Sequence, residues 1–551
     1  MNDNLRLAEL LFPACNITAE QYLTEIYPPR ALPEGAMVTR FAPSPTGFLH
    51  IGGVFTSLVD ERCAHQSGGV CYLRIEDTDK KREQEDGVSG IIRGLSDFGI
   101  AFDEGVTGYG TESGAYGPYT QSSRVEIYHA FCRDLVEKGH AYPCFCTEEE
   151  LSAIREEQEA QKVLPGYHGA YARCRTLTLA EVEEKLRAGL PYVVRLRSPG
   201  KPGGRVKFKD VIRGDIEMDD NITDIVLLKQ DGVPTYHFAH AVDDTLMRTT
   251  HVIRGEEWVP STNIHLQLFY VMGLKAPKFV HVSPVMKEDG GGKRKLSKRK
   301  DPEAAVSYFV EEGYPKEAVV EYLLTLLNSN FEDWRKQNKT ASCFDFPFSL
   351  KKMSQSGCLF DLVKLQSVSA GVISMMTAEQ VYDGVCAWAR QYDPALYEAL
   401  SRDPDYARGI FAIDRGGNKP RKDITKWSDA RAYVSYFYDD LSERQRETPE
   451  HISAEDQKAI LTAYLAVMNA EDDKDTWFAK IRDLCAPLGF SPDVKAYKAA
   501  PEQFKGHVGD VSSVLRAALT GRLQTPDLHS IMALLGQERC EARLRAGLMT
   551  L

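Results

Sequence analysis

Residues 40–53 constrain the fold of this 551-residue chain more than any other stretch. They read Arg-Phe-Ala-Pro-Ser-Pro-Thr-Gly-Phe-Leu-His-Ile-Gly-Gly and overlap an apolar run at residues 37–41. The apolar run predicts a buried strand, the two prolines stiffen a turn, and the final glycines open a helix. A strand, a shaped loop and a helix in this order predict an α/β fold that binds a nucleotide at the start of the helix.

The start of this helix has the properties of a phosphate site. Its unpaired backbone amides carry partial positive charge, and Gly52 and Gly53 allow a phosphate to approach closely. His50, at the loop exit, would donate hydrogen bonds to a phosphoryl group as charge builds during transfer. On the glycines alone, the alternative that His50 only caps the helix stays open.

A second stretch, residues 290–300, reads Gly-Gly-Gly-Lys-Arg-Lys-Leu-Ser-Lys-Arg-Lys. A glycine hinge followed by a cation cluster predicts a mobile loop that closes over a polyphosphate. The alternative is a charge run in solvent.

Together the two stretches resemble the paired signatures of class I aminoacyl-tRNA synthetases, which read His-Ile-Gly-His and Lys-Met-Ser-Lys-Ser. Here they read His-Ile-Gly-Gly at residues 50–53 and Lys-Leu-Ser-Lys-Arg at residues 295–299. These variants, and Arg-Ile-Glu-Asp-Thr-Asp at residues 74–79, are similar to those of bacterial glutamyl-tRNA synthetases. The resemblance covers nearly all of residues 37–551.

The resemblance implies ATP-dependent ligation of L-glutamate to tRNA(Glu) in two steps through glutamyl-adenylate, with Mg²⁺ on the polyphosphate and with release of AMP and pyrophosphate. One alternative is an enzyme that also charges tRNA(Gln) with glutamate. A small-molecule adenylyltransferase is disfavoured by roughly 200 residues of helical tail, because a small substrate needs no second platform. A non-catalytic tRNA-binding protein is disfavoured by the intact histidine and lysines of the signatures.

Charged side chains follow the predicted strands. Glu76 comes after an apolar run at residues 70–75, and Arg254 after another short apolar run. Because the carboxyl ends of parallel strands meet at one crevice, we expect both side chains to face it together with Arg40 and His50. A buried arginine needs a carboxylate partner, which a substrate with two carboxylates would supply. Glutamate fits better than glutamine, since an amide would leave a desolvated guanidinium partly unpaired.

The resemblance also implies roles for individual residues. The residues implied to stabilise charge on the phosphates are His50, Lys295 and Lys298. The residues implied to bind ATP are Gly47, His50, Gly52, Gly53, Glu257, Trp258, Lys295, Ser297 and Lys298. The residues implied to bind glutamate are Arg40, Ser44, Glu76, Tyr236 and Arg254.

Cys144, Cys146 and Cys174 are spaced to hold zinc, which prefers four tetrahedral nitrogen or sulfur ligands. Many bacterial relatives have such a site, with a histidine two places after the last cysteine. This chain has a threonine there, and Tyr167, His168 and Tyr171 are the candidates for the fourth ligand. Free cysteines that pack as small apolar groups are an equal alternative.

Composition limits the partners and the compartment. The formal net charge of −12 gives no global attraction to nucleic acid, so tRNA contacts must come from local basic patches. Twelve cysteines without disulfide-like regularity, no apolar run near the ~18 residues of a membrane span and no secretory pattern predict a cytoplasmic protein. We expect a monomer without membrane contact.

A chain of this length is too long for one core. The patterns and the resemblance predict an α/β fold with a Rossmann-like nucleotide-binding parallel sheet, split by an inserted acceptor-binding domain and followed by an all-α anticodon-binding region. The predicted parts are an N-terminal extension at 1–36, the first half of the catalytic domain at 37–118, an inserted acceptor-stem-binding domain at 119–224, the second catalytic half at 225–286, a stem-contact region with the Lys-Leu-Ser-Lys-Arg loop at 287–343, and the helical anticodon-binding region at 344–551.

Periodicity predicts further elements. These are a strand at 192–197, a hairpin from 206–210, a sheet that resumes at 224–229 and 234–239, a single strand at 279–286, and helices at 318–327, 430–441, 455–468, 475–484 and 511–519. The absence of a strand-rich region beyond residue 344 disfavours a glutaminyl-tRNA synthetase, whose anticodon region is built of β-barrels. Arg516 and Arg522 are either tRNA contacts or solvated helix-end charges.

Overall fold

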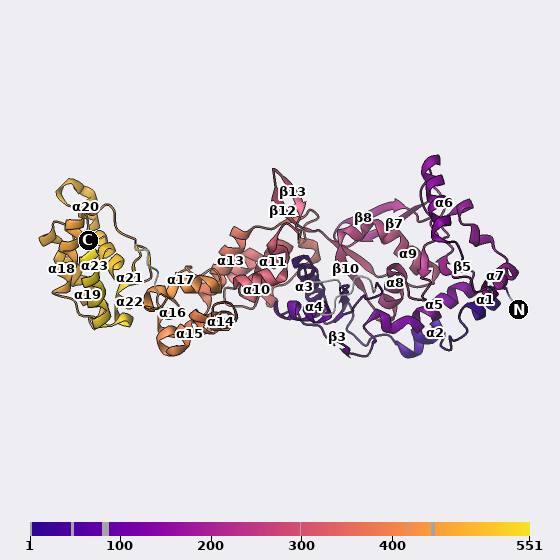
Figure 1. Cartoon of the computed structure of the whole chain (residues 1–551), viewed down its shortest axis with the longest axis horizontal. Helices are drawn as coiled ribbons and strands as arrows, with labels where there is room; N and C mark the ends of the chain where they lie inside the picture. The colour runs from indigo at the N-terminus through magenta and orange to yellow at the C-terminus, as the bar shows by residue number, and fades with distance from the viewer. Residues whose placement is uncertain are drawn as a thin grey trace. The chain divides into compact units, whose positions relative to one another are not determined.

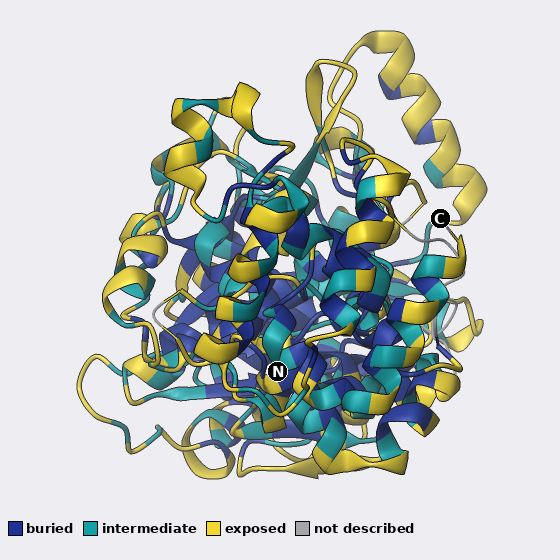
Figure 2. Ribbon diagram, turned by 90° about the vertical axis from the view of Figure 1, so that its left-hand side faces the viewer, coloured by how far each residue is buried: buried dark blue, intermediate teal, exposed yellow. Residues whose placement is uncertain are grey.

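The computed structural model describes residues 3–45, 49–79, 87–297, 299–417, 419–441 and 447–550. The chain divides into two compact units, Met1–Tyr308 with Leu323–Asp361 and Phe309–Tyr322 with Leu362–Leu551 (Figure 1). Buried residues lie inside and exposed residues on the outer faces of the helices (Figure 2). Among the described helices, none has the length and apolar character needed to cross a membrane.

The first unit contains all of the strands in the described residues. They are β1 (Val38–Phe41), β2 (Val70–Leu73), β3 (Glu104–Gly108), β4 (Thr111–Ser113), β5 (Ala141–Cys144), β6 (Val193–Leu196), β7 (Arg205–Asp210), β8 (Gly214–Asp219), β9 (Val226–Leu228), β10 (His251–Gly255), β11 (Lys278–Val282), β12 (Val285–Asp289), β13 (Gly292–Lys295) and β14 (Cys358–Leu359). Its helices are α1 (Asp3–Leu11), α2 (Ala19–Gln21), α3 (Ile51–Gln66), α4 (Gly87–Ser96), α5 (Val125–Glu137), α6 (Glu148–Gln161), α7 (Leu179–Arg187), α8 (Tyr236–Leu246), α9 (Thr262–Val271) and α12 (Phe331–Gln337). Helices α10 (Val306–Glu312) and α11 (Lys316–Leu327) contain points where the chain passes between the units.

Parallel strands form the centre of the first unit. β1 pairs in parallel with β2 and β2 with β3, while β10 pairs in parallel with β11. A hydrogen bond of 2.9 Å from the backbone N–H of Thr250 to the carbonyl of Val38 joins β10 to β1. The carboxyl ends of β1, β2 and β10 therefore reach the same edge, and the predicted parallel sheet is confirmed.

The inserted segment is built of antiparallel strands. β5 pairs with β6 and β7 with β8, so the predicted hairpin is confirmed. β9 pairs antiparallel with β6 and extends this sheet, not the parallel one. The prediction that the parallel sheet resumes at residues 224–229 was therefore wrong, because β9 finds its hydrogen-bonding partner in the inserted sheet.

Two more predictions need correction around the predicted second half of the sheet. Residues 234–239 do not extend it, since α8 begins at Tyr236 after Thr235, and its buried Phe238, Ala239, Val242 and Leu246 follow helical spacing. The strand predicted at 279–286 is two strands, β11 and β12.

The glycine-rich stretch that was predicted to be a hinge is the turn of a hairpin. β12 and β13 pair antiparallel up to Asp289 and Gly292, which leaves Gly290 and Gly291 as a two-residue loop. Their φ values are 57° and 89°, and a positive φ at both central residues is what the tightest hairpin turns require. Glycine adopts these angles without strain, so the same residues suit a fixed turn as well as a hinge.

Residues 3–36 are part of the core of the first unit. Helix α1 packs against α5, and a π-helical turn follows α2 at Tyr22–Ile26. Arg30 donates two hydrogen bonds of 2.8 Å to Glu104, and Arg248 donates to the carbonyl of Tyr27 at 2.5 Å. The predicted extension is thus an integral element of this unit.

The second unit is helical in its described residues, as predicted. Its further helices are α13 (Leu362–Met375), α14 (Ala378–Tyr392), α15 (Pro394–Arg402), α16 (Pro404–Ala412), α17 (Ala430–Val434), α18 (Ala454–Leu465), α19 (Lys474–Leu488), α20 (Val494–Ala499), α21 (Val508–Thr520), α22 (Leu528–Leu535) and α23 (Gln537–Thr550). The helix predicted at 430–441 ends early at Val434, where a 3₁₀ turn follows. One buried apolar cluster runs from Ile373 to Leu544.

Candidate functional site

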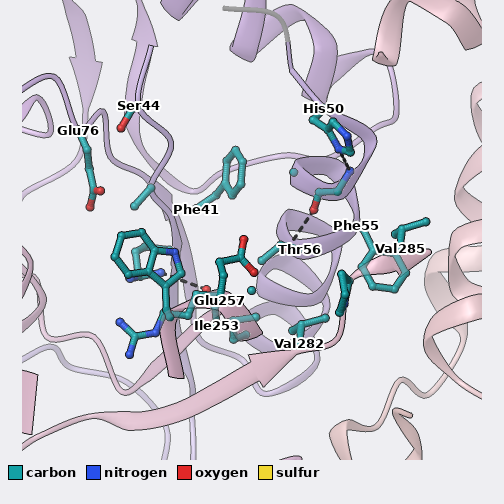
Figure 3. Close-up of a pocket in the computed structure, with 18 of the residues that line it drawn as sticks. Phe41, Ser44, His50, Phe55, Thr56, Glu76, Ile253, Glu257, Val282 and Val285 are labelled. Atoms are coloured by element: carbon teal, nitrogen blue, oxygen red, sulfur yellow. Dashed lines mark hydrogen bonds between the residues drawn. The ribbon is translucent and has the colours of Figure 1, made fainter. Parts of the chain in front are cut away.

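A cavity of about 670 Å³ opens where β1 and β10 end and α3 begins. Most of the residues predicted to bind ATP or glutamate line it, namely Arg40, Ser44, His50, Gly52, Gly53, Glu76, Tyr236, Arg254, Glu257, Trp258 and Lys295. Ser297 does not line it, and the predicted Gly47 and Lys298 lie outside the described residues. Ser44 and Glu76 lie on one side of the cavity and His50 on the other, with Glu257 between them (Figure 3).

His50 is the N-cap of α3. Its Nδ1 accepts a hydrogen bond of 2.9 Å from the backbone N–H of Gly52. Because Nδ1 accepts, the proton of the neutral ring must be on Nε2. The cap fixes the tautomer that can donate from Nε2, so the capping role and the predicted phosphate contact are compatible.

Two of the buried arginines near this cavity share carboxylates. Arg40 Nε donates to Asp244 Oδ1 at 3.2 Å. Arg74 donates to Asp244 Oδ1 at 2.7 Å and to Glu76 Oε1 at 2.9 Å. Burial favours the neutral acid, but Arg40 and Arg74 hold the pKa of Asp244 well below its ordinary value. These four side chains form a connected group of two cations and two anions.

Arg254 is held differently. Its side chain is buried, and its guanidinium contacts His281 Nε2 at 3.0 Å, His265 Nδ1 at 2.9 Å and Thr262 Oγ1 at 3.0 Å. Within the described part of the chain, no carboxylate pairs with it. Burial lowers the pKa of Arg254 to about 10, and Arg40 acts in the same direction, although Tyr236 and Asp244 oppose this. A ligand carboxylate would therefore find an uncompensated cation at the end of β10.

Aromatic and ionic contacts line the remainder of the cavity. The Tyr236 ring stacks on Trp258 with centroids 4.4 Å apart, and burial raises the pKa of Tyr236 to about 12. Tyr236 thus stays a neutral hydroxyl at physiological pH. Lys295 Nζ lies 3.2 Å from Glu257 Oε1.

Asp301 organises the loop that carries the second signature. It accepts hydrogen bonds of 2.6 and 2.8 Å from Arg294 and one of 2.9 Å from the backbone N–H of Ser297. The hydrogen bonds from Arg294, together with those from Ser297 and Lys287, hold the pKa of Asp301 well below its ordinary value. Ser297 is therefore placed by its backbone, at the base of the hairpin and beside the cavity-lining Lys295.

A cluster of thiols lies apart from this cavity, in the inserted segment. The Sγ atoms of Cys144, Cys146 and Cys174 all lie within 4.8 Å of one another. The hydroxyl of Tyr167 lies 3.2 Å from Cys146 Sγ. His168, one of the other predicted fourth ligands, is hydrogen-bonded to a backbone carbonyl instead.

The sequence patterns did not single out Arg74, Asp244, His265 or His281. Arg74 is fully buried, and an arginine inside an apolar strand signals that a carboxylate must lie nearby. The partner, Asp244, is 170 residues further along the chain, so local pattern alone cannot find it.

Known families match two segments of the chain. The catalytic domain of tRNA synthetases class I (E and Q) matches residues 36–365, and an anticodon binding domain matches residues 494–548. A glutamate–tRNA ligase of Clostridium perfringens strain 13 is 52% identical over 98% of this chain and 99% of its own length. A glutamate–tRNA ligase of Sorangium cellulosum is 48% identical over 94% of this chain and 96% of its own length.

A solved structure gives the same result. The crystal structure of a glutamate tRNA ligase from Elizabethkingia meningosepticum in complex with its amino acid matches with a TM-score of 0.75 and 29% identity. The match covers 94% of this chain and 99% of that one. From the paired signatures, the cavity that His50 and Lys295 both line, and relatives of about half identity over nearly the whole length, the chain belongs to the glutamate–tRNA ligases among the class I tRNA synthetases.

Proposed function

We propose that this cavity is where ATP and L-glutamate react and where the glutamyl group passes to tRNA(Glu). In the first step a carboxylate oxygen of glutamate attacks the α-phosphorus of ATP, and pyrophosphate leaves. In the second step a ribose hydroxyl of the tRNA attacks the acyl carbon, and AMP leaves. No side chain need act as the nucleophile, so the protein contributes orientation and charge stabilisation.

The observation that carries this proposal is the buried Arg254, which has no carboxylate partner among the residues that the structure describes. Arg254 would bind the side-chain carboxylate of glutamate, with the neutral hydroxyl of Tyr236 beside it. Arg40 and Ser44 would orient the α-carboxylate, and Glu76 would receive the ammonium group. Glu76 keeps capacity for this because Arg74 donates to its Oε1, whereas no side chain in the described part of the chain donates to its Oε2.

The other side of the cavity suits the nucleotide. The amides at the start of α3 and Nε2 of His50 would bind phosphate oxygens. Lys295 would stabilise the pyrophosphate as it leaves, and we assign the same role to Lys298 from its place in the signature. Gly47, Gly52, Gly53, Glu257, Trp258 and Ser297 complete the proposed ATP-binding set. ATP would enter as its Mg²⁺ complex, which neutralises part of the polyphosphate charge.

The proposal is tested by aminoacylation of purified tRNA(Glu) and tRNA(Gln) with labelled glutamate. We expect ATP-dependent charging of tRNA(Glu). Charging of both tRNAs would identify an enzyme that does not discriminate between them. If neither tRNA is charged, the proposal is wrong.

The remaining parts of the chain would bind the tRNA. We propose that residues 119–224 bind the acceptor stem, residues 287–343 contact the stem, and residues 344–551 bind the anticodon, with 37–118 and 225–286 as the catalytic halves. The anticodon-domain match at residues 494–548 supports the last of these. We also expect a cytoplasmic monomer, which light scattering of the purified enzyme tests for oligomeric state.

We propose a structural zinc ion in the inserted segment, held by Cys144, Cys146, Cys174 and Tyr167. The donor set fits, because three thiols converge within 4.8 Å and the Tyr167 oxygen lies beside them. His168 and Tyr171 are hydrogen-bonded elsewhere. Zinc would cross-link β5 to the turn that carries Cys174 and so stabilise this segment.

Elemental analysis tests the zinc site independently of activity. The purified enzyme should contain one zinc per chain, and Tyr167→Phe should lower zinc affinity about 10-fold or more without abolishing binding. Tyr171→Phe is the matched control and should retain zinc. A metal-free enzyme whose thiols react freely would show that the cysteines only pack.

A further inference from the structure

The uncompensated guanidinium of Arg254 is surrounded by histidines. His281 at the end of β11 and His265 on α9 contact it directly. His237 lies 2.9 Å from His265, and the ring of His240 has its centroid 4.6 Å from that of His265. His240, His265 and His281 are completely buried. Such a concentration of buried imidazoles around one cation needs a physical reason.

The hydrogen bonds have one self-consistent arrangement of protons. A guanidinium only donates, so His281 Nε2 and His265 Nδ1 must accept and carry no proton. His281 then donates from Nδ1 to Asp210 Oδ2 at 2.7 Å. His265 then donates from Nε2 to His237 Nδ1 at 2.9 Å. Both histidines that contact Arg254 are therefore neutral imidazoles with defined tautomers.

The nearest carboxylate behind His281 is already satisfied. Asp210 accepts from His281 Nδ1 and from the backbone N–H groups of Ile212, Arg213 and His281 itself. It orients His281 but does not reach the guanidinium. Thr262, the third partner of Arg254, is a neutral hydroxyl that donates to the carbonyl of Trp258 at 3.2 Å.

Neutral histidines are what these surroundings favour. Burial lowers the pKa of His265 well below its ordinary value, and the adjacent Arg254 acts in the same direction. Burial also lowers the pKa of His281, although Asp210 opposes this. Both rings therefore accept hydrogen bonds at physiological pH.

We propose that His265 and His281 are positioning residues that hold Arg254 by neutral acceptors and so reserve its positive charge for the side-chain carboxylate of glutamate. The inference rests on the proposed role of Arg254 in binding that carboxylate. An aspartate or glutamate in their place would orient the guanidinium equally well, but it would form an internal ion pair in competition with the substrate. Glutamate is then selected over neutral glutamine because only the carboxylate of glutamate supplies the negative charge that the hydrogen-bonding partners of Arg254 do not.

Two isosteric variants of His265 test this. In His265→Asn the side-chain oxygen takes the place of Nδ1 and remains a neutral acceptor, whereas His265→Asp places a charged oxygen at the same point. In tRNA(Glu) aminoacylation at pH 7.5, we expect the KM for glutamate to change less than about threefold in the first and to rise about tenfold or more in the second, with the KM for ATP unchanged in both. Equal KM values for glutamate in the two variants would overturn the proposal.

Thermal unfolding would reveal whether substitution of His265 disturbs the fold. In that case two variants of His281 provide an independent test. His281→Gln keeps an acceptor near the position of Nε2, and His281→Leu removes it. The first should retain a near-normal KM for glutamate and the second should raise it about tenfold; identical values would again contradict the role. A wild-type enzyme that does not charge tRNA with glutamate would refute the proposed function instead, so the two failures are distinguishable.

Discussion

The two ring nitrogens of His50 serve different purposes at the start of α3. Nδ1 accepts from the backbone N–H of Gly52 and caps the helix. This contact leaves the proton on Nε2, which makes the ring a donor for a phosphate oxygen. A single side chain thus supports both the helix start and the proposed phosphoryl chemistry, and substitution can separate the two contributions.

His50→Asn keeps an acceptor oxygen at the position of Nδ1 but has no group at the position of Nε2. We expect this variant to keep the Tm of the wild type and to lose about 10²-fold in kcat for aminoacylation, as for removal of one donor to a developing oxyanion. His50→Ala, the control, should lose the cap as well and lower stability by about 1 kcal/mol. A fully active His50→Asn enzyme would reduce His50 to a cap.

The sequence alone identified the charged side chains that follow strands. It did not identify the side chains that pair with these charges or hold them by hydrogen bonds. Arg40, Glu76 and Arg254 each come at the end of an apolar run, and the geometry of parallel sheets brings such positions together. Arg74 and His281 become recognisable only when the helices and strands that surround them are placed. Their partners are distant in sequence and depend on packing between elements.

At the level of elements, the β12–β13 hairpin determines where the second signature lies. The hairpin brings Lys295 to the cavity, and Asp301 fixes the residues after it through Arg294 and the backbone of Ser297. Asp301 is buried, whereas Lys295, on the same loop, lines the cavity. We therefore expect Asp301 to affect catalysis through the position of this loop, without touching the substrate.

Asp301→Asn should test this coupling. The amide would present an NH₂ group where two donors now converge, so the loop should lose its fixed position. We expect kcat to fall and the KM for ATP to rise, together about tenfold in kcat/KM, with the KM for glutamate unchanged. Asp289→Asn removes the other, exposed carboxylate that contacts Arg294 and should leave the kinetics unaltered.

Elements were predictable where one local signal determines them. The apolar run before the first signature gave β1, and the apolar spacing at residues 318–327 gave α11. The hairpin was missed because three glycines suit a hinge and a turn equally. The assignment of β9 was wrong because an apolar strand does not specify which sheet it joins.

On the scale of the whole molecule, the first unit carries buried histidines in its core. His240 is completely buried between Asp244 and the arginines of the site, and its Nδ1 lies 2.8 Å from Asp244 Oδ2. Burial lowers the pKa of His240 to about 4, although Asp244 opposes this. Burial also lowers the pKa of His251 to about 4, and Lys278 acts in the same direction.

These shifts predict a defined pH dependence of stability. Both histidines take up protons more readily in the unfolded chain, with a pKa of about 6.5, than in the folded one. These histidines should therefore leave the free energy of unfolding unreduced above about pH 6.5. As the pH falls from there towards about 4, the free energy of unfolding should decrease. Calorimetry between pH 7.5 and 4.5 checks this, and His240→Gln should show a shallower decrease. A Tm that is constant across this range would contradict the prediction.

The embedding of residues 3–36 has a consequence for biosynthesis. The segment is translated first, yet Arg248, which holds its backbone at Tyr27, follows 221 residues after Tyr27. At about 5 to 20 residues per second, roughly 10 to 45 s separate the two on the ribosome. Helix α5, against which α1 packs, is made earlier in that interval, so we expect the segment to dock in two stages, its first helix before its backbone at Tyr27.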